Sequence, residues 1–336
     1  MPDGDVVGSG VRLMKSLDAL TAVQQPHLPR KEVTMTKLNK KRKWFIALSL
    51  IVPMVLLTAF VVIPAFDLFR MSFTNWDGYS KNSRFIGTDN YISMLHNKDL
   101  WLSLKNNAVY FFVHLLMIPL ELMFAVLLNS RLRAAKFYKT MVFLPYIING
   151  VAISYAFSYF FSPINGAFDS ILELFHLGNL SRDWLSDNRI VNYVLSSVSV
   201  WRFSGYHVVL FMAALQSIPK DIEEAAMVDG ARSWHLFKYI QIPAIMLMVD
   251  FVLFDNIRGA LQVFDIPFVM TSGGPGYASS TFTLYTIKTA FSFSNFGLAS
   301  TMAVAIMIMI VGVYFIQNTI IHGLVLRDSP AKKCQQ

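Results

Sequence analysis

Apolar segments of bilayer length alternate with short charged connections along most of this chain, and this pattern restricts its fold more than any other feature. Only 15% of the residues are charged, compared with about 25% in a typical soluble domain. At about 1.5 Å per residue, a helix of about 20 apolar residues crosses a hydrocarbon core of about 30 Å. The shorter alternating strands of a membrane β-barrel are not seen. The sequence therefore predicts an all-α polytopic membrane protein.

Six segments are long enough to cross the membrane, and they divide the chain into three parts. The predicted spans cover residues 44–66, 107–128, 141–161, 191–215, 242–270 and 298–321. The fifth is the least regular, because Asp250, Asp255 and Arg258 interrupt it. The predicted parts are a basic tail at residues 1–43, a membrane domain at residues 44–325 and a C-terminal tail at residues 326–336.

The basic residues orient these spans, because Lys and Arg accumulate in cytoplasmic connections. A basic run at residues 37–43 puts the N-terminus in the cytoplasm, and four basic residues at 131–139 put that loop inside as well. The loop 162–190, which carries four acidic residues against two basic ones, suits the outer side. Both termini are therefore expected in the cytoplasm. Topology also explains the net charge of +8, and no nucleic-acid partner is predicted.

One loop does not follow the charge rule. Loop 216–241 falls inside, yet its carboxylates outnumber its basic residues. The acidic residues from Asp221 to Glu224 suit the first turn of a helix, where the helix dipole favours negative charge. Ala225 and Ala226 let another surface approach closely, and Gly230 ends the helix. Two interpretations fit: an amphipathic connector at the membrane interface, or a docking surface for another protein.

A spaced motif in this loop favours docking. Glu224-Ala225-Ala226 is followed after three residues by Gly230, and after nine more by Ile240-Gln241-Ile242-Pro243. This pattern resembles the EAA motif of ABC-importer permease subunits, with Ile242 where leucine is usual. Residues 264–291, "FDIPFVMTSGGPGYASSTFTLYTIKTAF", resemble the carbohydrate-uptake branch, which includes maltose and oligosaccharide permeases. The resemblance covers about residues 44–325 and leaves out the N-terminal tail.

The resemblance implies a mechanism and a set of partners. A cytoplasmic coupling helix between spans 4 and 5 would seat in a groove of an ATP-hydrolysing subunit, through Glu224, Ala225, Ala226, Asp229 and Gly230. The partners would be a second homologous permease, two ABC ATPase subunits and an extracytoplasmic solute-binding protein. The assembly would import a sugar or oligosaccharide across the lipid bilayer of the bacterial cytoplasmic (inner) membrane.

The resemblance also implies that this chain is no enzyme. It has no GxxxxGK[ST] phosphate loop, so ATP and Mg are expected on the partner ATPase subunits. The glycine-rich turn at Gly273, Gly274 and Pro275 lacks the required lysine and follows no strand; it is expected to face the solute-binding protein. No catalytic residue and no metal site is predicted, because the histidines are scattered and the single cysteine is Cys334.

Polar residues inside the spans are the candidates for contact with substrate, since intramembrane charges are costly. Carboxylates, amides and Arg suit sugar hydroxyls, and aromatic rings suit the apolar faces of sugars. The substrate-path candidates are Trp201, Tyr206, Asp250, Asp255, Asn256, Arg258, Gln262 and Phe264. Asp255 and Arg258 fit equally well a structural ion pair at i,i+3 spacing. Glu121, alone in the second span, is expected to be a paired structural group.

A different class of protein also accounts for the charges of the fifth span. An ion-coupled secondary transporter would use Asp250 and Asp255 to bind the driving ion, and it would need no ATPase partner. The lack of an obvious inverted repeat among the six spans argues against this alternative.

Overall fold

The structure is a computed structural model that describes residues 40–129 and 135–328. Within these ranges the regular structure is helical, and extended pairing is limited to one antiparallel bridge between Thr74 and Phe85. The all-α prediction is confirmed for this part of the chain. The predicted tail up to residue 39, the loop residues Arg131 and Arg133, and Cys334 lie outside the described residues.

The chain divides between Ile63 and Pro64 into two compact units. In the described part of the first unit, α2 (Lys40–Leu57) continues through a π-helical turn (Thr58–Val62). The helix α3 (Ile63–Met71) begins at the last residue of this unit, and its other residues belong to the second unit. This apolar stretch includes the predicted first span. Pro53 lies inside α2.

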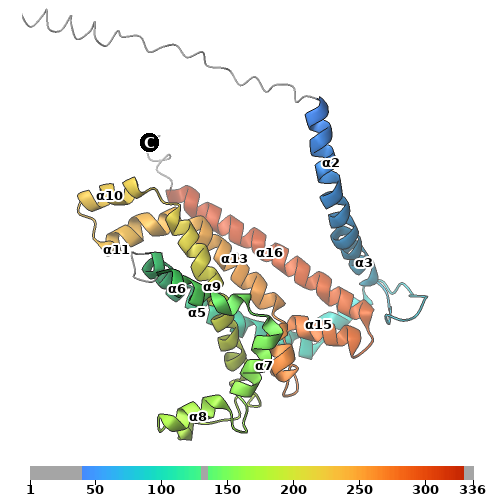
Figure 1. The fold of residues 1–336 in the computed structure, drawn as a ribbon. Helices are drawn as coiled ribbons and strands as arrows, with labels where there is room; N and C mark the ends of the chain where they lie inside the picture. The colour runs from blue at the N-terminus through green and yellow to red at the C-terminus, as the bar shows by residue number, and fades with distance from the viewer. Residues whose placement is uncertain (1–39, 130–134, 329–336) are drawn as a thin grey trace, which may run out of the picture. The chain divides into compact units, whose positions relative to one another are not determined.

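The second unit is built on long helices that correspond to four of the five remaining predicted spans. These are α5 (Lys98–Asn129), α9 (Val191–Gln216), α13 (Met246–Gln262) and α16 (Phe296–Asp328). The shorter elements are α4 (Asp89–His96), α6 (Ala135–Ile147), α7 (Gly150–Phe160), α8 (Ala167–Leu174), the 3₁₀ turn Gly178–Leu180, α10 (Lys220–Val228), α11 (Ser233–Leu236), the π-helical turn Phe237–Gln241, α12 (Ile242–Ala244), α14 (Asp265–Thr271) and α15 (Phe282–Phe291). Figure 1 shows α9, α13 and α16 running alongside one another.

Two predicted spans are not straight helices. By length and composition, four described helices are able to cross a membrane, and the number is six if each of two bent pairs forms one span. The predicted span 141–161 is broken between α6 and α7, with a bend of 93°. Asn149 causes this break, because its side-chain oxygen caps α7 by accepting from Val151 N at 2.9 Å and Ala152 N at 3.3 Å.

The second bent pair changes the prediction for span 242–270. The helical segment begins at Ser233 and bends by 69° at Ile245. This bend lies before Asp250, the first of the charged residues that were expected to interrupt the span. At the bend Ile245 leaves the helical conformation, with φ of −99° and ψ of 11°, and Pro243 just before it cannot donate an N–H to the preceding turn. The fifth span is therefore irregular at its beginning and helical through Asp250, Asp255 and Arg258.

Asparagine side chains hold the chain where it leaves α13. Asn107 donates to Ala260 O at 2.5 Å and accepts from Phe282 N at 2.8 Å. Asn106 donates to Ser280 O at 2.8 Å, and Asn192 donates to Ala278 O at 2.7 Å. These bonds satisfy backbone groups between α13 and α15 that no helix pairs, as buried backbone requires.

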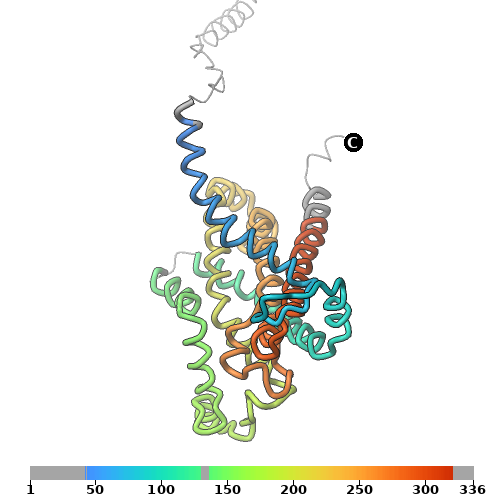
Figure 2. The backbone as a smooth tube through the Cα atoms, turned by 90° about the vertical axis from the view of Figure 1, so that its right-hand side faces the viewer, coloured from blue at the N-terminus to red at the C-terminus, as the bar shows by residue number. Residues whose placement is uncertain are grey.

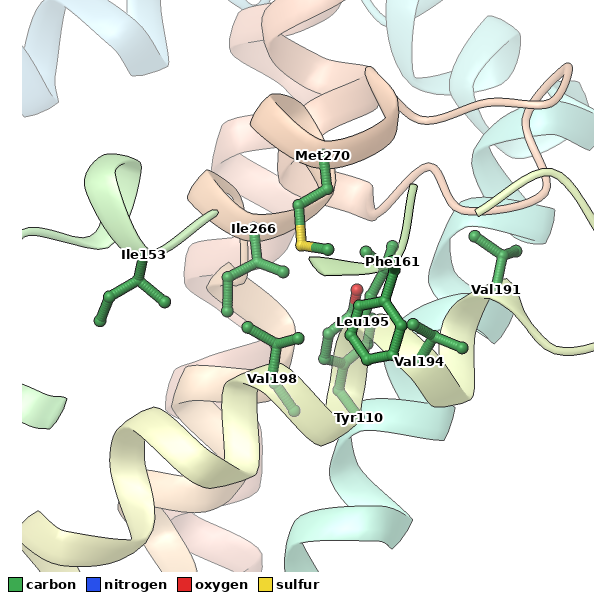
Figure 3. Close-up of a cluster of buried hydrophobic side chains, with 10 residues drawn as sticks. Tyr110, Ile153, Phe161, Val191, Val194, Leu195, Val198, Ile266 and Met270 are labelled. Atoms are coloured by element: carbon green, nitrogen blue, oxygen red, sulfur yellow. The ribbon is translucent and has the colours of Figure 1, made fainter. Parts of the chain in front are cut away.

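An apolar cluster fixes α14 against the long helices. Figure 3 shows Ile266 and Met270 of α14 beside Val198 and Leu195 of α9, with Tyr110 of α5 next to them. All five side chains are buried. The segment after α13 therefore turns back into the core of this unit.

The two ends of the second unit carry different connections. In Figures 1 and 2 the segment α10–α11 and the C-terminal end of α16 lie at one end, and α8 lies at the opposite end.

On the loop that follows α3, the Ser80 hydroxyl and the backbone N–H groups of Ser80 and Tyr79 lower the pKa of Asp77 to about 2. These bonds keep Asp77 ionised and define a polar turn at residues 77–80.

A close approach between α9 and α6 yields a test of the packing. A Cβ atom at Gly205 would overlap the Val142 carbonyl oxygen, so we expect Gly205→Ala to destabilise the protein by about 1–3 kcal/mol, as overpacking does. The matched control is Gly312→Ala in α16, where an added Cβ meets nothing within 4 Å. Thermal unfolding in detergent should show a lower midpoint for Gly205→Ala only; equal midpoints would contradict this packing.

Candidate functional site

A cavity of about 380 Å³ lies among α5, α9 and the C-terminal half of α13. Its size falls within the usual range for small-molecule sites. It is lined by aromatic, amide, histidine and charged side chains, from residues Tyr110, His114, Ser199, Phe203, His207, Asp255, Asn256, Arg258, Gly259, Ala260, Gln262, Val263, Phe264 and Asp265. The mixture of polar groups and rings makes this cavity the best candidate for a ligand site in the described part of the chain.

A chain of ionisable groups links the three helices beside the cavity. His207 Nδ1 lies 3.0 Å from Glu121 Oε2, and His207 Nε2 lies 3.7 Å from Asp255 Oδ2. Arg258 Nη2 donates to Asp255 Oδ1 at 2.6 Å, and Arg258 Nη1 donates to Gln262 Oε1 at 3.1 Å. The side chains of Glu121 and His207 are at most 4% exposed. Each buried charge is thus placed next to a partner, as desolvation demands.

The structure confirms the prediction for Glu121 and shows the ion pair that was one of two interpretations of Asp255 and Arg258. Glu121 is a paired group, and its partner is His207. Asp255 and Arg258 form the i,i+3 ion pair that their spacing indicates. The pair also lines the cavity. The ion-pair interpretation and the substrate-path interpretation of these two residues therefore do not exclude each other.

A second ion pair lies next to the first residue of α7. Arg202 of α9 donates to the carboxylate of Asp265 at the start of α14. Gly150 is the first residue of α7, and a Cβ there would overlap both Asp265 and Arg202. Only glycine leaves room for this three-way contact. Arg202 therefore joins α9 to α14 next to the cavity.

The structure brings together five of the eight substrate-path candidates. Those that line the cavity are Asp255, Asn256, Arg258, Gln262 and Phe264. Trp201 instead packs edge-on against Phe157 with ring centroids 5.2 Å apart, and Tyr206 stacks on Tyr146 at 4.7 Å. Asp250 accepts a hydrogen bond from Gln317 Nε2 of α16. These three do not belong to the cavity wall.

The cavity residues of α5 and α9 were not among the predicted site residues. His114 and Ser199 form a hydrogen bond of 2.9 Å across the two helices, and His207 is the centre of the ionisable chain. Ser199, Phe203 and His207 follow one another at intervals of four, which puts them on one helical face. The four-residue spacing was the signal in the sequence for this shared face. The spacing of the histidines alone does not reveal it.

The loop predicted to couple to an ATPase forms the expected helix and turn. In α10, Glu224 and Ala225 are exposed, and Ala226 is half-buried. Gly230 has φ of +86°; its N–H donates to Met227 O and Ala231 N–H donates to Ala226 O. These two bonds form a Schellman motif, which ends the helix as predicted for Gly230. Asp229 and Gly230 are exposed beyond it.

The surface of α10 also carries exposed apolar side chains. Met227 is 54% exposed and Val228 is 88% exposed. Glu223 is turned inward, where it accepts from Gln241 Nε2 at 2.8 Å. This bond ties α10 to the helix that leads into the fifth span.

The glycine-rich turn between α14 and α15 is only partly exposed. Gly273 is buried with φ of +80°, Gly274 is half-buried, and Pro275 is exposed. Ser279 Oγ donates to Gly274 O at 2.6 Å, and Lys288 Nζ donates to Ser272 O at 2.5 Å. These bonds hold the turn in place. Within it Gly273 is buried, and Pro275 is exposed and available for contact with another molecule.

Together, the membrane-spanning helices, the central polar cavity and the exposed acidic helix describe a membrane-embedded transport subunit. Residues 117–325 match the model of the family described as "Binding-protein-dependent transport system inner membrane component". The chain therefore belongs to this family of inner membrane components, the permease subunits of ABC importers that the EAA motif predicted.

Curated relatives extend over most of the chain. A probable ABC transporter permease protein, YurN, from Bacillus subtilis (strain 168) is 30% identical over 80% of this chain and 92% of its own length. The lactose transport system permease protein LacF from Rhizobium radiobacter is 31% identical over 78% and 89%. The trehalose/maltose transport system permease protein MalF from Thermococcus litoralis is 26% identical over 82% and 93%.

A solved structure has the same fold. A chain of a bacterial ABC transporter involved in the import of the acidic polysaccharide alginate superposes with a TM-score of 0.74. It covers 86% of this chain and 97% of its own length, at 20% sequence identity. The family membership favours the ATP-driven importer over the ion-coupled secondary transporter that the charges of the fifth span also suggested.

The buried pair of Glu121 and His207 gives a second test. Glu121→Leu leaves His207 without this partner, and breaking one side of a buried pair costs about 3–5 kcal/mol. Glu121→Gln keeps a hydrogen-bonding oxygen near His207 Nδ1, so we expect a smaller loss. Thermal unfolding of the two variants in detergent checks this order. A Glu121→Leu variant as stable as the Glu121→Gln variant would show that the pair contributes little.

Proposed function

We propose that this chain forms part of the membrane-spanning path of an ABC importer that moves a sugar or oligosaccharide across the bacterial cytoplasmic membrane. The observation that carries the proposal is the cavity among α5, α9 and α13. It combines rings with amide and carboxylate groups, the combination that sugar recognition uses. Relatives named for lactose, trehalose and maltose uptake support the substrate class.

The substrate path we propose runs through the cavity. Asp255, Asn256, Arg258, Gln262 and Phe264 would contact the passing sugar. Asp255 and Arg258 are paired with each other in the cavity wall, at 2.6 Å. The rings of Phe203 and Phe264 offer apolar faces.

The helix α10 would couple this path to ATP hydrolysis on partner subunits. Its exposed Glu224, Ala225 and Asp229 suit a protein groove, and Ala225 permits close approach. ATP and Mg would bind to two ABC ATPase subunits, whose closure moves α10. Because Glu223 bonds to Gln241, that movement reaches the fifth span and reorients the cavity as a rigid-body switch.

We further propose six spans with both termini in the cytoplasm. The position of α10–α11 at the same end as the C-terminal end of α16 supports this orientation (Figure 1). In that arrangement residues 44–325 form the membrane domain, 1–43 and 326–336 are cytoplasmic tails, and 216–241 is the coupling loop.

A cysteine introduced at Val228 in a Cys334→Ser background should be labelled from the cytoplasmic side only. Labelling from outside would contradict the proposed orientation.

The remaining partners are proposed from the family and from the outer surface. A second homologous permease would complete the path, and an extracytoplasmic solute-binding protein would deliver the sugar near Pro275. One solved structure of the alginate ABC transporter is a complex with an alginate pentasaccharide-bound periplasmic protein, which supports such delivery.

Purification through this chain from native membranes tests the assembly. We expect an ABC ATPase pair, a second permease and a solute-binding protein to come with it after gentle detergent extraction. The complete system in liposomes should take up at least one member of a panel of neutral and acidic mono- and oligosaccharides, and only with ATP inside. A chain that purifies alone and moves solute without ATP would refute the proposal.

Gly230→Pro tests the coupling role of α10. Proline removes the N–H that bonds to Met227 O and prohibits the positive φ of this residue. We expect uptake and sugar-stimulated ATP hydrolysis to fall at least about tenfold, since the turn no longer presents α10 correctly. Gly87→Pro is the matched control, because Gly87 also has a positive φ and open space around it. Coupling that survives Gly230→Pro would exclude α10 as the coupling element.

A further inference from the structure

The charged groups of the cavity compensate one another. Arg258 directs all three of its guanidinium nitrogens to Asp255 and Gln262. His207 lies between two carboxylates, Glu121 and Asp255. Asp265 pairs with Arg202. No described cation in the wall is left to neutralise a charge brought in by a ligand.

Two buried polar groups of the wall have no partner in the described part of the chain. Asn256 is 5% exposed, and neither the oxygen nor the nitrogen of its amide forms a hydrogen bond. The Tyr110 hydroxyl is buried without a partner as well. Buried polar atoms are almost always hydrogen-bonded, because an unmade bond costs the full desolvation penalty. Both residues line the cavity. Their polar atoms are almost inaccessible in this structure, so each side chain has to turn slightly to bond to a ligand there.

We infer that the cavity selects a neutral sugar unit over one that carries a carboxylate, and that Asn256 and Tyr110 bind the hydroxyls of that unit. This inference rests on the proposed function and adds the class of sugar. An amide presents a donor and an acceptor side by side, which matches neighbouring sugar hydroxyls. Phe203 and Phe264 contribute apolar surface in the same wall.

A sugar carboxylate is disfavoured by the same arrangement. It would lose part of its hydration beside Asp255 and Asp265, whose cationic partners are already engaged, and no unpaired described cation of the wall replaces that hydration. Arg258 would have to leave Asp255 to receive it, which breaks an existing pair. A neutral hydroxyl needs no such rearrangement.

The test begins with the sugar that the complete system imports best from the mixed panel. Its binding is then measured on the assembled transporter in lipid nanodiscs, without the solute-binding protein. The binding of the same sugar with one primary hydroxyl oxidised to a carboxylate is measured in parallel. We expect the best sugar to be neutral and its carboxylate counterpart to bind at least about tenfold more weakly.

Substitutions identify the groups that bind the hydroxyls. Asn256→Leu, of similar size, should raise the Kd for the neutral sugar about 10-fold to 100-fold, and Tyr110→Phe about 3-fold to 10-fold. Tyr110→Phe changes one atom and keeps the packing, so it decides the matter if Asn256→Leu does not fold. Ser197→Ala is the control, because Ser197 bonds to Val194 O and does not line the cavity.

The outcomes separate the two proposals. Import of no sugar in the panel overturns the proposed function, and this inference with it. Import of an acidic sugar as the best substrate, or equal binding of the carboxylate counterpart, overturns the neutral selection and leaves the importer in place. An unchanged Kd in the variants that fold removes Asn256 and Tyr110 from recognition.

Discussion

Where a helix stops inside a membrane, its backbone groups find no water, and they need partners in the protein. In this chain the buried backbone from the end of α13 to the start of α15 has this requirement, whereas the turn at Pro275 is exposed. Asn106, Asn107 and Asn192 supply the partners from α5 and α9. This bonding holds the C-terminal half of α13 against the other two helices. The cavity, its charged wall and the turn that leads to Pro275 all depend on it.

The ionisable groups follow from the same constraint. A buried charge is best tolerated beside a partner. Two of the pairs join different helices, Glu121 with His207 and Arg202 with Asp265, and Asp255 pairs with Arg258 within α13. Pairing joins the helices, and it also neutralises the wall of the cavity. A path built in this way needs a few unpaired neutral groups to recognise a passing solute. Asn256 and Tyr110 are such groups in the described wall.

The coupling loop and the cavity represent opposite uses of polar residues. On α10 the carboxylates and small residues are exposed, with a Schellman turn at Gly230 that fixes how the helix ends. In the cavity the polar groups are enclosed and paired. The bond of Glu223 with Gln241 links the two regions, since it connects α10 to the helix that bends at Ile245 and continues as α13. This connection is consistent with the coupling role proposed for α10.

The sequence by itself determined the features that depend on local order and spacing. Apolar length predicted the membrane helices, the i,i+3 spacing of Asp255 and Arg258 predicted their pair, and the EAA motif identified the family through residues close in the chain. Only the tertiary structure decided the break at Asn149, the bend at Ile245, the partner of Glu121 and the removal of Trp201, Tyr206 and Asp250 from the cavity wall. These depend on contacts between residues far apart in sequence. The periodicity of one helix specifies which side chains share a face, and the neighbouring helix decides what that face meets.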